Sequence, residues 1–185
     1  MTTATKITLV RLFLIPIFVL FVYLNFRYSN LIAALIYFLA CVSDVIDGIV
    51  ARKHNQISDN GAFLDALVDK LLILAALAII IDKNVIPSPI NVIIALFLIS
   101  RDIMMQGFRG MAGKKGIVIP ADKLGKAKTL FQMVGTVALM LTLDEILIKA
   151  YSFFYWLGLI SLLLSVVFSI VSLIHYIWKY KEVLK

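Results

Sequence analysis

The sequence is poor in charged residues and nearly lacks cysteine and histidine. Only 16% of its 185 residues are charged and 62% are hydrophobic, whereas roughly 45 to 50% of the residues in soluble domains are apolar. This excludes an ordinary soluble domain and indicates a membrane protein. The single cysteine, Cys41, excludes an internal disulfide and is expected to be a small core residue. The two histidines, His54 and His175, are isolated, which excludes a zinc site built from Cys and His clusters.

Six apolar stretches run along the chain, each near the roughly 20 residues that a membrane-spanning helix needs. Short polar joints separate them, without internal repeats or low-complexity tracts. We expect one all-α domain over residues 1–185, a polytopic membrane protein with six transmembrane helices. Apolar stretches recur as far as Trp178, so the first is expected to stay in the protein rather than be removed as a signal peptide. The expected helices cover residues 7–26, 31–51, 62–81, 90–111, 124–143 and 151–178.

Basic residues outnumber acidic ones by 18 to 11, and they are unevenly distributed. Cytoplasmic loops of membrane proteins carry an excess of Lys and Arg. If the N-terminus is inside, only Arg27, Lys83 and Lys149 lie in the outer joints. We therefore expect a multi-pass protein of the cell membrane with both termini cytoplasmic. The net charge of +7 then reflects topology and attraction to anionic membrane lipid rather than binding to nucleic acid.

Four aspartates interrupt the apolar pattern at the cytoplasmic ends of the second and third expected helices. Asp44 and Asp47 are three residues apart and Asp65 and Asp69 are four apart, so each pair occupies one helix face. Carboxylates at such short spacing repel one another in a low-dielectric environment, so a cation is expected between them. Hard oxygen ligands suit magnesium, manganese or calcium, and four carboxylates can hold two ions.

Other interpretations of these aspartates remain open. Some of them could pair with Arg52, Lys53 or Lys70 in an ion network at the helix ends. A divalent-cation or proton-coupled transporter would also bury carboxylates. A transporter, however, needs acids along a path through the membrane, and Asp82 and Asp144 mark only the far loops. A structural membrane protein has no need for the acids.

Small residues accompany the aspartates, which leaves room for a ligand, although small residues in membrane helices more often serve helix packing. The combined pattern is D-x-x-D-G-x-x-A-R over residues 44–52 and G-x-x-x-D-x-x-x-D over residues 61–69. It resembles the signature of the CDP-alcohol phosphatidyltransferases. The segments ITLVRLFLIPIF, ARKHNQISDNGAFLDALVDKLL and GFRGMAGKKGIVIPADKLGKAKTLFQM resemble the phosphatidylglycerophosphate synthase branch of that family. Two positions depart from the branch: Ala66, where proline is common, and Asp102, where glutamate commonly follows the arginine.

The resemblance implies a membrane enzyme with six transmembrane helices, usually a homodimer. Its reaction would transfer the phosphatidyl group of CDP-diacylglycerol to sn-glycerol 3-phosphate, giving phosphatidylglycerophosphate and CMP. Phosphatidylglycerol, serine and inositol phosphate remain alternative acceptors. The resemblance also implies two divalent cations, Mg or Mn, bound by Asp44, Asp47, Asp65 and Asp69, with Asp69 as the general base. The nucleotide would be bound by Asp47, Gly48, Ala51, Arg52 and Gly61.

Basic residues at the same depth are candidates for binding the phosphate of the acceptor. Arg11 and Arg109 are set among apolar residues, where an unpaired charge is costly, so a bound phosphate would supply their partner. The start of the fifth helix would add its dipole. Positive-inside topology is the alternative explanation, and we prefer it for Lys114 and Lys115. The expected glycerol-phosphate site consists of Thr8, Arg11, Arg109, Lys123, Lys126 and Lys128.

Overall fold

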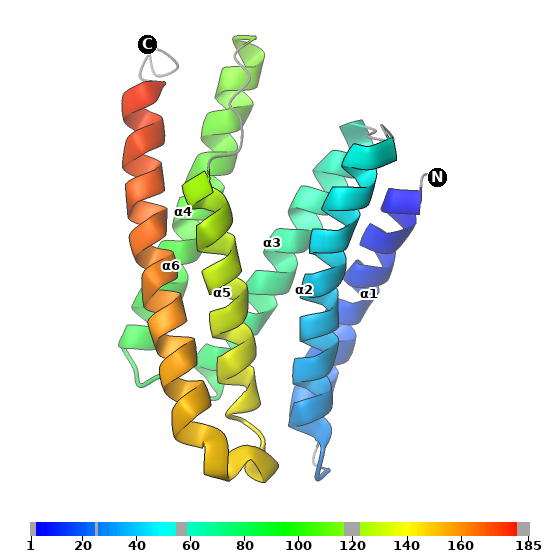
Figure 1. The fold of residues 1–185 in the computed structure, drawn as a ribbon, viewed down its shortest axis with the longest axis vertical. Coiled ribbons are helices and arrows are strands. Elements are labelled where there is room, and N and C mark those ends of the chain that lie inside the picture. Colours follow the sequence, from blue (N-terminus) through cyan, green and yellow to red (C-terminus); the bar gives the residue numbers. More distant parts are fainter. Residues whose placement is uncertain (1–2, 25, 55–58, 117–122, 181–185) are drawn as a thin grey trace.

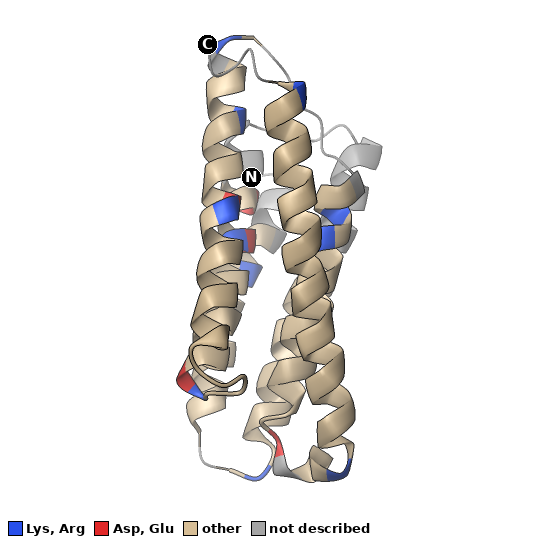
Figure 2. Ribbon diagram, turned by 90° about the vertical axis from the view of Figure 1, so that its left-hand side faces the viewer, with Lys and Arg blue, Asp and Glu red and all other residues tan. Residues whose placement is uncertain are grey.

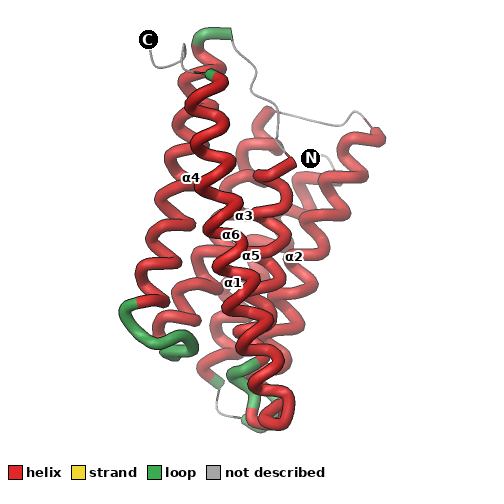
Figure 3. The backbone as a smooth tube through the Cα atoms, turned by 60° about the vertical axis from the view of Figure 1, so that its left-hand side comes forward, coloured by secondary structure: helices red, strands yellow, loops and turns green. Residues whose placement is uncertain are grey.

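The computed structural model describes residues 3–24, 26–54, 59–116 and 123–180. Within these ranges it contains helices and loops but no strand (Figure 3), which confirms the all-α prediction. Side chains are not described for residues 3–7, 44–54, 59–63, 114, 123 and 145. The helices are α1 (Thr3–Tyr23), α2 (Ser29–His54), α3 (Asp59–Asp82), α4 (Ile90–Lys114), α5 (Lys123–Leu141) and α6 (Tyr151–Lys179), with a short 3-10 helix, η1 (Glu145–Ala150), before α6.

The helices differ from the predicted apolar stretches mainly in the polar joints. α2 continues to His54 and α3 begins at Asp59, although the joint was predicted over residues 52–61. Apolar character marks where a helix can lie in lipid, whereas backbone hydrogen bonding continues through residues such as Arg and Lys that favour helices. α1 and α5, by contrast, end two or three residues before the predicted positions.

The helices form an elongated up-and-down bundle (Figure 1). α1 packs against α2 and α3, α4 against α3 and α6, and α5 packs along α6 while also contacting α2 and α3. The end of α2 and the start of α3 lie toward the same end of the bundle as the start of α1 and the end of α6. The turns before α4 and before α6 lie at the opposite end.

Close packing in the interior depends on small residues. Gly158 of α6 lies so near α5 that a Cβ atom there would be 2.6 Å from Leu139 Cγ and 3.1 Å from the Gly135 carbonyl oxygen. Such small residues let helix backbones approach each other closely. Elsewhere, the buried rings of Phe18 and Tyr37 lie 5.4 Å apart, which joins α1 to α2.

The outer surface of the bundle is apolar. Large hydrophobic side chains such as Phe13, Leu39 and Trp178 are exposed, and soluble monomers rarely expose extended apolar patches. In the part of the chain that the structure describes, two helical segments are long and apolar enough to cross a membrane, Ile90–Gly113 and Ile146–Lys179. Shorter apolar helices cover Thr8–Tyr23 and Ser29–Ser43.

Candidate active site

Charged residues gather toward one end of the bundle and in the turns at the opposite end (Figure 2). The first group includes the aspartates of α3, because Asp65 and Asp69 fall in the early turns of a helix that begins at Asp59. Asp44 and Asp47 lie in the last turns of α2, at the same end of the bundle, but their side chains are outside the described part. The backbone thus brings the four aspartates of the signature to one end of the molecule.

Asp65 is held by two residues of α1. Arg11 Nη1 donates to Asp65 Oδ1 at 3.1 Å, and Thr8 Oγ1 donates to the same oxygen at 3.4 Å. Arg11 Nε also donates to the Oγ of Ser43 on α2 at 3.4 Å. The Arg11 side chain is fully buried, whereas 44% of the Asp65 side chain is exposed. Arg11 therefore joins three helices and orients one carboxylate oxygen, while the carboxylate keeps access to a ligand.

Asp69 lies one turn further along α3, beside Lys70. Lys70 Nζ is 3.4 Å from Asp69 Oδ2 and 3.7 Å from Oδ2 of Asp102 on α4. The Lys70 side chain is 39% exposed, so solvent screens these ion pairs and their contribution to stability is small. These contacts matter for the geometry of the site, because the Lys70 ammonium group connects Asp69 on α3 to Asp102 on α4.

Asp102 is the centre of a network that contains the buried residues Arg101, Lys128 and Ser172 and the partly exposed Lys70, called here the Asp102 network. Lys128 Nζ donates to both carboxylate oxygens of Asp102, at 2.5 and 2.6 Å. Arg101 donates from Nη1 to Asp102 at 3.2 Å and from Nη2 to Ser172 Oγ at 2.9 Å. Buried charges are stable in a low-dielectric interior when they are paired in this way. The network joins α3, α4, α5 and α6 at the depth of Asp69.

The other residues predicted to bind the acceptor lie in different surroundings. Arg109 is exposed on α4, with its guanidinium 5.8 Å from the centre of the Tyr176 ring. Lys126 is exposed near the start of α5, and Lys128 is buried against Asp102. The side chain of Lys123 is outside the described part. Thr8 and Arg11 face Asp65 rather than standing apart as a separate phosphate site.

The residues predicted to bind the nucleotide flank the polar joint between α2 and α3. They fall in the last turns of α2 and the first turn of α3, and their side chains are outside the described part. These residues are Asp47, Gly48, Ala51, Arg52 and Gly61.

Sequence reasoning assigned no role to Asp102 or Ser172. Asp102 did carry a signal, because an ionisable residue inside an apolar helix is a functional candidate by default. Ser172 had no such signal, since serines are common in membrane helices as small packing residues. Only the tertiary structure places its hydroxyl beside Arg101.

The donor chemistry of the aspartates fits a hard divalent cation. Asp65 and Asp69 supply carboxylate oxygens from adjacent turns of one helix, and such ligands suit magnesium or manganese rather than a thiolate-binding metal. In the part of the chain that the structure describes, no three or more His, Cys, Asp or Glu side chains lie close enough together to hold a metal ion. The side chains of Asp44 and Asp47 lie outside that part.

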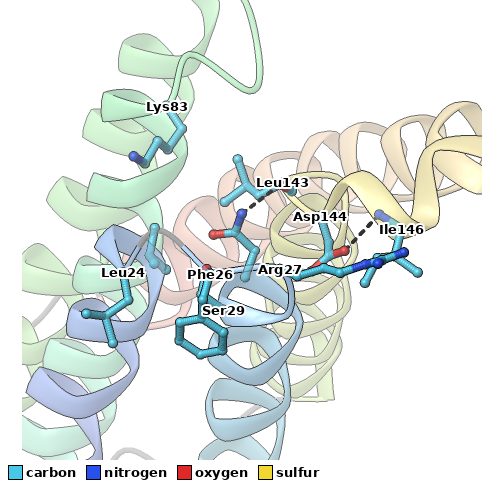
Figure 4. Close-up of a pocket in the computed structure, with 10 residues that line it drawn as sticks. Leu24, Phe26, Arg27, Ser29, Lys83, Leu143, Asp144 and Ile146 are labelled. Carbon is cyan, nitrogen blue, oxygen red and sulfur yellow. Dashed lines mark hydrogen bonds between the residues drawn. The ribbon is translucent and has the colours of Figure 1, made fainter.

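A cavity of about 850 Å³ lies at the opposite end of the bundle (Figure 4). Its wall contains Asp144, whose carboxylate accepts hydrogen bonds from the backbone N–H groups of Leu31 and Ile146, each at 2.9 Å. Asn30 Nδ2 donates to the Leu143 carbonyl at 2.8 Å. These contacts tie the start of α2 to the turn after α5. The described residues that line this cavity include neither Asp65 nor Asp69, and the backbone of α2 places Asp44 and Asp47 at the other end of the bundle, where the candidate active site lies.

Residues 1–174 match the family model described as CDP-alcohol phosphatidyltransferase. The chain belongs to the CDP-alcohol phosphatidyltransferase family. The match covers the aspartates of α2 and α3, the cations of α1, and the whole Asp102 network. The resemblance noted in the sequence is therefore confirmed.

Relatives named CDP-diacylglycerol-glycerol-3-phosphate 3-phosphatidyltransferase are similar over nearly the whole chain. The one from Bacillus subtilis (strain 168) is 33% identical over 192 residues, covering 97% of this chain and 95% of the relative. The one from Sodalis glossinidius is 33% identical over 177 residues, covering 94% and 92%. The one from Haemophilus influenzae is 33% identical over 178 residues, covering 92% and 89%.

Proposed function

We propose that this protein is a membrane enzyme that transfers the phosphatidyl group of CDP-diacylglycerol to sn-glycerol 3-phosphate, giving phosphatidylglycerophosphate and CMP. The observation that carries the proposal is that relatives with this named activity are similar over more than nine-tenths of the chain. The collection of carboxylates and cations at one end of the bundle supports it, because the reaction needs a base and partners for several phosphate groups.

In the proposed reaction, Asp69 is the general base. The hydroxyl oxygen of the acceptor forms a bond to the phosphatidyl phosphorus while the bond from that phosphorus to the CMP oxygen breaks. The hydroxyl proton passes to the Asp69 carboxylate, and positioned bases of this kind typically contribute about 10²- to 10⁴-fold in rate. Lys70 Nζ, 3.4 Å from Asp69 Oδ2, orients that carboxylate.

The aspartates would hold two divalent cations, Mg or Mn. Bound there, these ions would neutralise charge on the diphosphate of CDP-diacylglycerol. Arg11 and Thr8 fix the orientation of Asp65 through its Oδ1 atom. The proposed ligands are Asp44, Asp47, Asp65 and Asp69, and the proposed nucleotide-binding residues are Asp47, Gly48, Ala51, Arg52 and Gly61.

Cations at the same end of the bundle would bind the phosphate of glycerol 3-phosphate. Charge-assisted hydrogen bonds from Arg and Lys to phosphate are short and strong. Arg109 is exposed and Lys128 is buried beside the Asp102 carboxylate. Arg109 would therefore contact the phosphate from the surface of the bundle and Lys128 from its interior. The full set proposed for this role is Thr8, Arg11, Arg109, Lys123, Lys126 and Lys128.

The topology follows from the same proposal. Residues 1–185 would form one domain whose six helices all cross the cell membrane, with both termini and the active site at the cytoplasmic face. The excess of Lys and Arg at that end supports this orientation. A homodimer is proposed by analogy with the family.

Assay of the purified protein with CDP-diacylglycerol and a panel of acceptors tests the proposal. The panel contains glycerol 3-phosphate, glycerol, serine, inositol phosphate and phosphatidylglycerol, and both CMP and the lipid product are measured. Glycerol 3-phosphate is expected to give the highest kcat/KM, and activity is expected to disappear in excess chelator. Preference for another acceptor, or full turnover without divalent metal, would refute it.

A further inference from the structure

The buried carboxylate of Asp102 is a meeting point of four helices. Lys128 of α5 donates to both of its oxygens, and Arg101 donates to Oδ1 from its own helix. Lys70 of α3 approaches to 3.7 Å, and Arg101 continues the connection to Ser172 of α6. Because Lys70 also contacts Asp69, Asp102 is separated from the proposed base by one side chain.

The buried part of this network has a net positive charge, which an additional anion would balance. Its buried side chains carry two positive charges, on Arg101 and Lys128, against one negative charge on Asp102. An excess charge in a low-dielectric interior is costly. In addition, Arg101 Nε is buried and has no hydrogen-bond partner among the described residues. An excess positive charge and an unused donor both favour an anionic ligand.

We propose that Asp102 is a positioning residue that holds Lys128 and Arg101 as a pair for binding a phosphate group beside Asp69. The inference rests on the proposed function, in which that phosphate belongs to the acceptor. The Lys128 side chain is only 2% exposed. Without the carboxylate, its ammonium group would lose its counter-charge and would turn away or lose its proton. In either case the phosphate would lose a donor.

The number of N–H donors on Lys128 and Arg101 decides whether Asp102 positions these cations or competes with phosphate for them. If Asp102 competed with phosphate for the same cations, removing its charge would strengthen phosphate binding. Lys128 has three N–H donors, and its two contacts with Asp102 leave the third for a ligand. Arg101 likewise uses Nη1 and Nη2 within the network and keeps Nε. Both cations can therefore bind phosphate while Asp102 stays in place.

The first test measures binding without turnover. Isothermal titration calorimetry follows inorganic phosphate and glycerol 3-phosphate binding to the full-length protein in detergent, with magnesium and CMP present. Asp102→Asn is expected to weaken both ligands by about tenfold or more, and Asp102→Glu is expected to restore binding to within about threefold of wild type. Asp82→Asn, which makes the same substitution at the far end of α3, is the matched control and is expected to change binding less than threefold.

Kinetics provide a second measurement that a purely structural role would not reproduce. In Asp102→Asn, the KM for glycerol 3-phosphate is expected to rise about tenfold or more, while the KM for CDP-diacylglycerol changes less than twofold. If Asp102 acts through Lys128, the double variant Asp102→Asn/Lys128→Gln should bind phosphate as Lys128→Gln alone does. The double variant also removes both charges together, which keeps the test available if Asp102→Asn alone does not fold.

Several results would overturn the proposal. In the binding experiments, these are unchanged or tighter phosphate binding in folded Asp102→Asn, or no phosphate binding by the wild-type protein. In the kinetic experiments, the contradicting result is an equal change in the KM values for glycerol 3-phosphate and CDP-diacylglycerol. For the double variant, it is phosphate binding a further tenfold weaker than that of Lys128→Gln alone. Failure of the proposed function is a separate outcome, because it would appear as a wild-type protein that binds phosphate but releases no CMP with glycerol 3-phosphate.

Discussion

Arg11 of α1 is paired across the bundle with Asp65 of α3, with 3.1 Å between Nη1 and Oδ1. The arginine is completely buried and the carboxylate is partly exposed. The apolar surroundings of Arg11 in the sequence indicated a missing anionic partner, which we expected to be the phosphate of the acceptor. The structure supplies an internal partner instead, so Arg11 has a second interpretation, as the residue that orients a proposed metal ligand.

Replacement of Arg11 by Gln distinguishes these two roles. If Arg11 orients Asp65, Arg11→Gln should lower kcat by about tenfold or more, since a hydrogen bond to a charged group is worth about 1.5 to 3 kcal/mol. The KM for glycerol 3-phosphate should stay within twofold. Initial-rate kinetics measure both quantities, with Arg27→Gln at the opposite end of the bundle as the control. A raised KM at unchanged kcat would instead support the proposed role of Arg11 in binding the acceptor.

Asp69→Asn should slow the chemical step without abolishing the binding of magnesium and CDP-diacylglycerol. The amide cannot accept the hydroxyl proton, so kcat should fall by about 10²- to 10⁴-fold while magnesium and CDP-diacylglycerol still bind. Calorimetry of the variant with CDP and magnesium, beside single-turnover rates, makes the comparison, and Asp82→Asn at the far end is the control. If nucleotide binding disappears together with turnover, Asp69 is primarily a metal ligand.

Arg109→Ala should weaken the binding of glycerol 3-phosphate selectively. Arg109 is exposed and contacts the Tyr176 ring from 5.8 Å, so its loss should leave the fold intact. We expect the KM for glycerol 3-phosphate to rise roughly tenfold, which corresponds to one charged hydrogen bond, with little change for CDP-diacylglycerol. Lys179→Ala, which removes a cation 5.6 Å from the Tyr180 ring, is a matched control. A defect confined to CDP-diacylglycerol would contradict the assignment.

Gly158→Ala should destabilise the contact between α5 and α6. The added Cβ would meet Leu139 Cγ at 2.6 Å and the Gly135 carbonyl at 3.1 Å, and overpacking of this kind typically costs about 1 to 3 kcal/mol. Thermal unfolding in detergent should show a lower midpoint. Gly107→Ala on α4 is the control, because its Cβ would meet nothing within 4 Å. Equal midpoints for the two variants would show that α5 and α6 can separate without cost.

Much of the fold was predictable because its determinants are local. Apolar stretches of about 20 residues mark helices wherever they occur, and α4, predicted over residues 90–111, is found at Ile90–Lys114. The spacing of Asp65 and Asp69 likewise assigns both to one helix face before any packing is known. Family membership also follows from sequence alone, since the signature consists of residue types at set intervals.

The partners of the buried charges were decided only by the tertiary structure. Lys128 was predicted to bind a substrate phosphate, yet its ammonium group contacts Asp102, a residue to which no role was assigned from the sequence. Arg11 similarly lies on Asp65. Such pairs depend on how each helix is rotated and shifted against its neighbours. That arrangement is set by interdigitating side chains over whole helix surfaces, including the close approach of α5 and α6 at Gly135 and Gly158. Hydropathy and spacing within one helix contain no information on this arrangement, so they locate charged residues in depth but leave their partners undetermined.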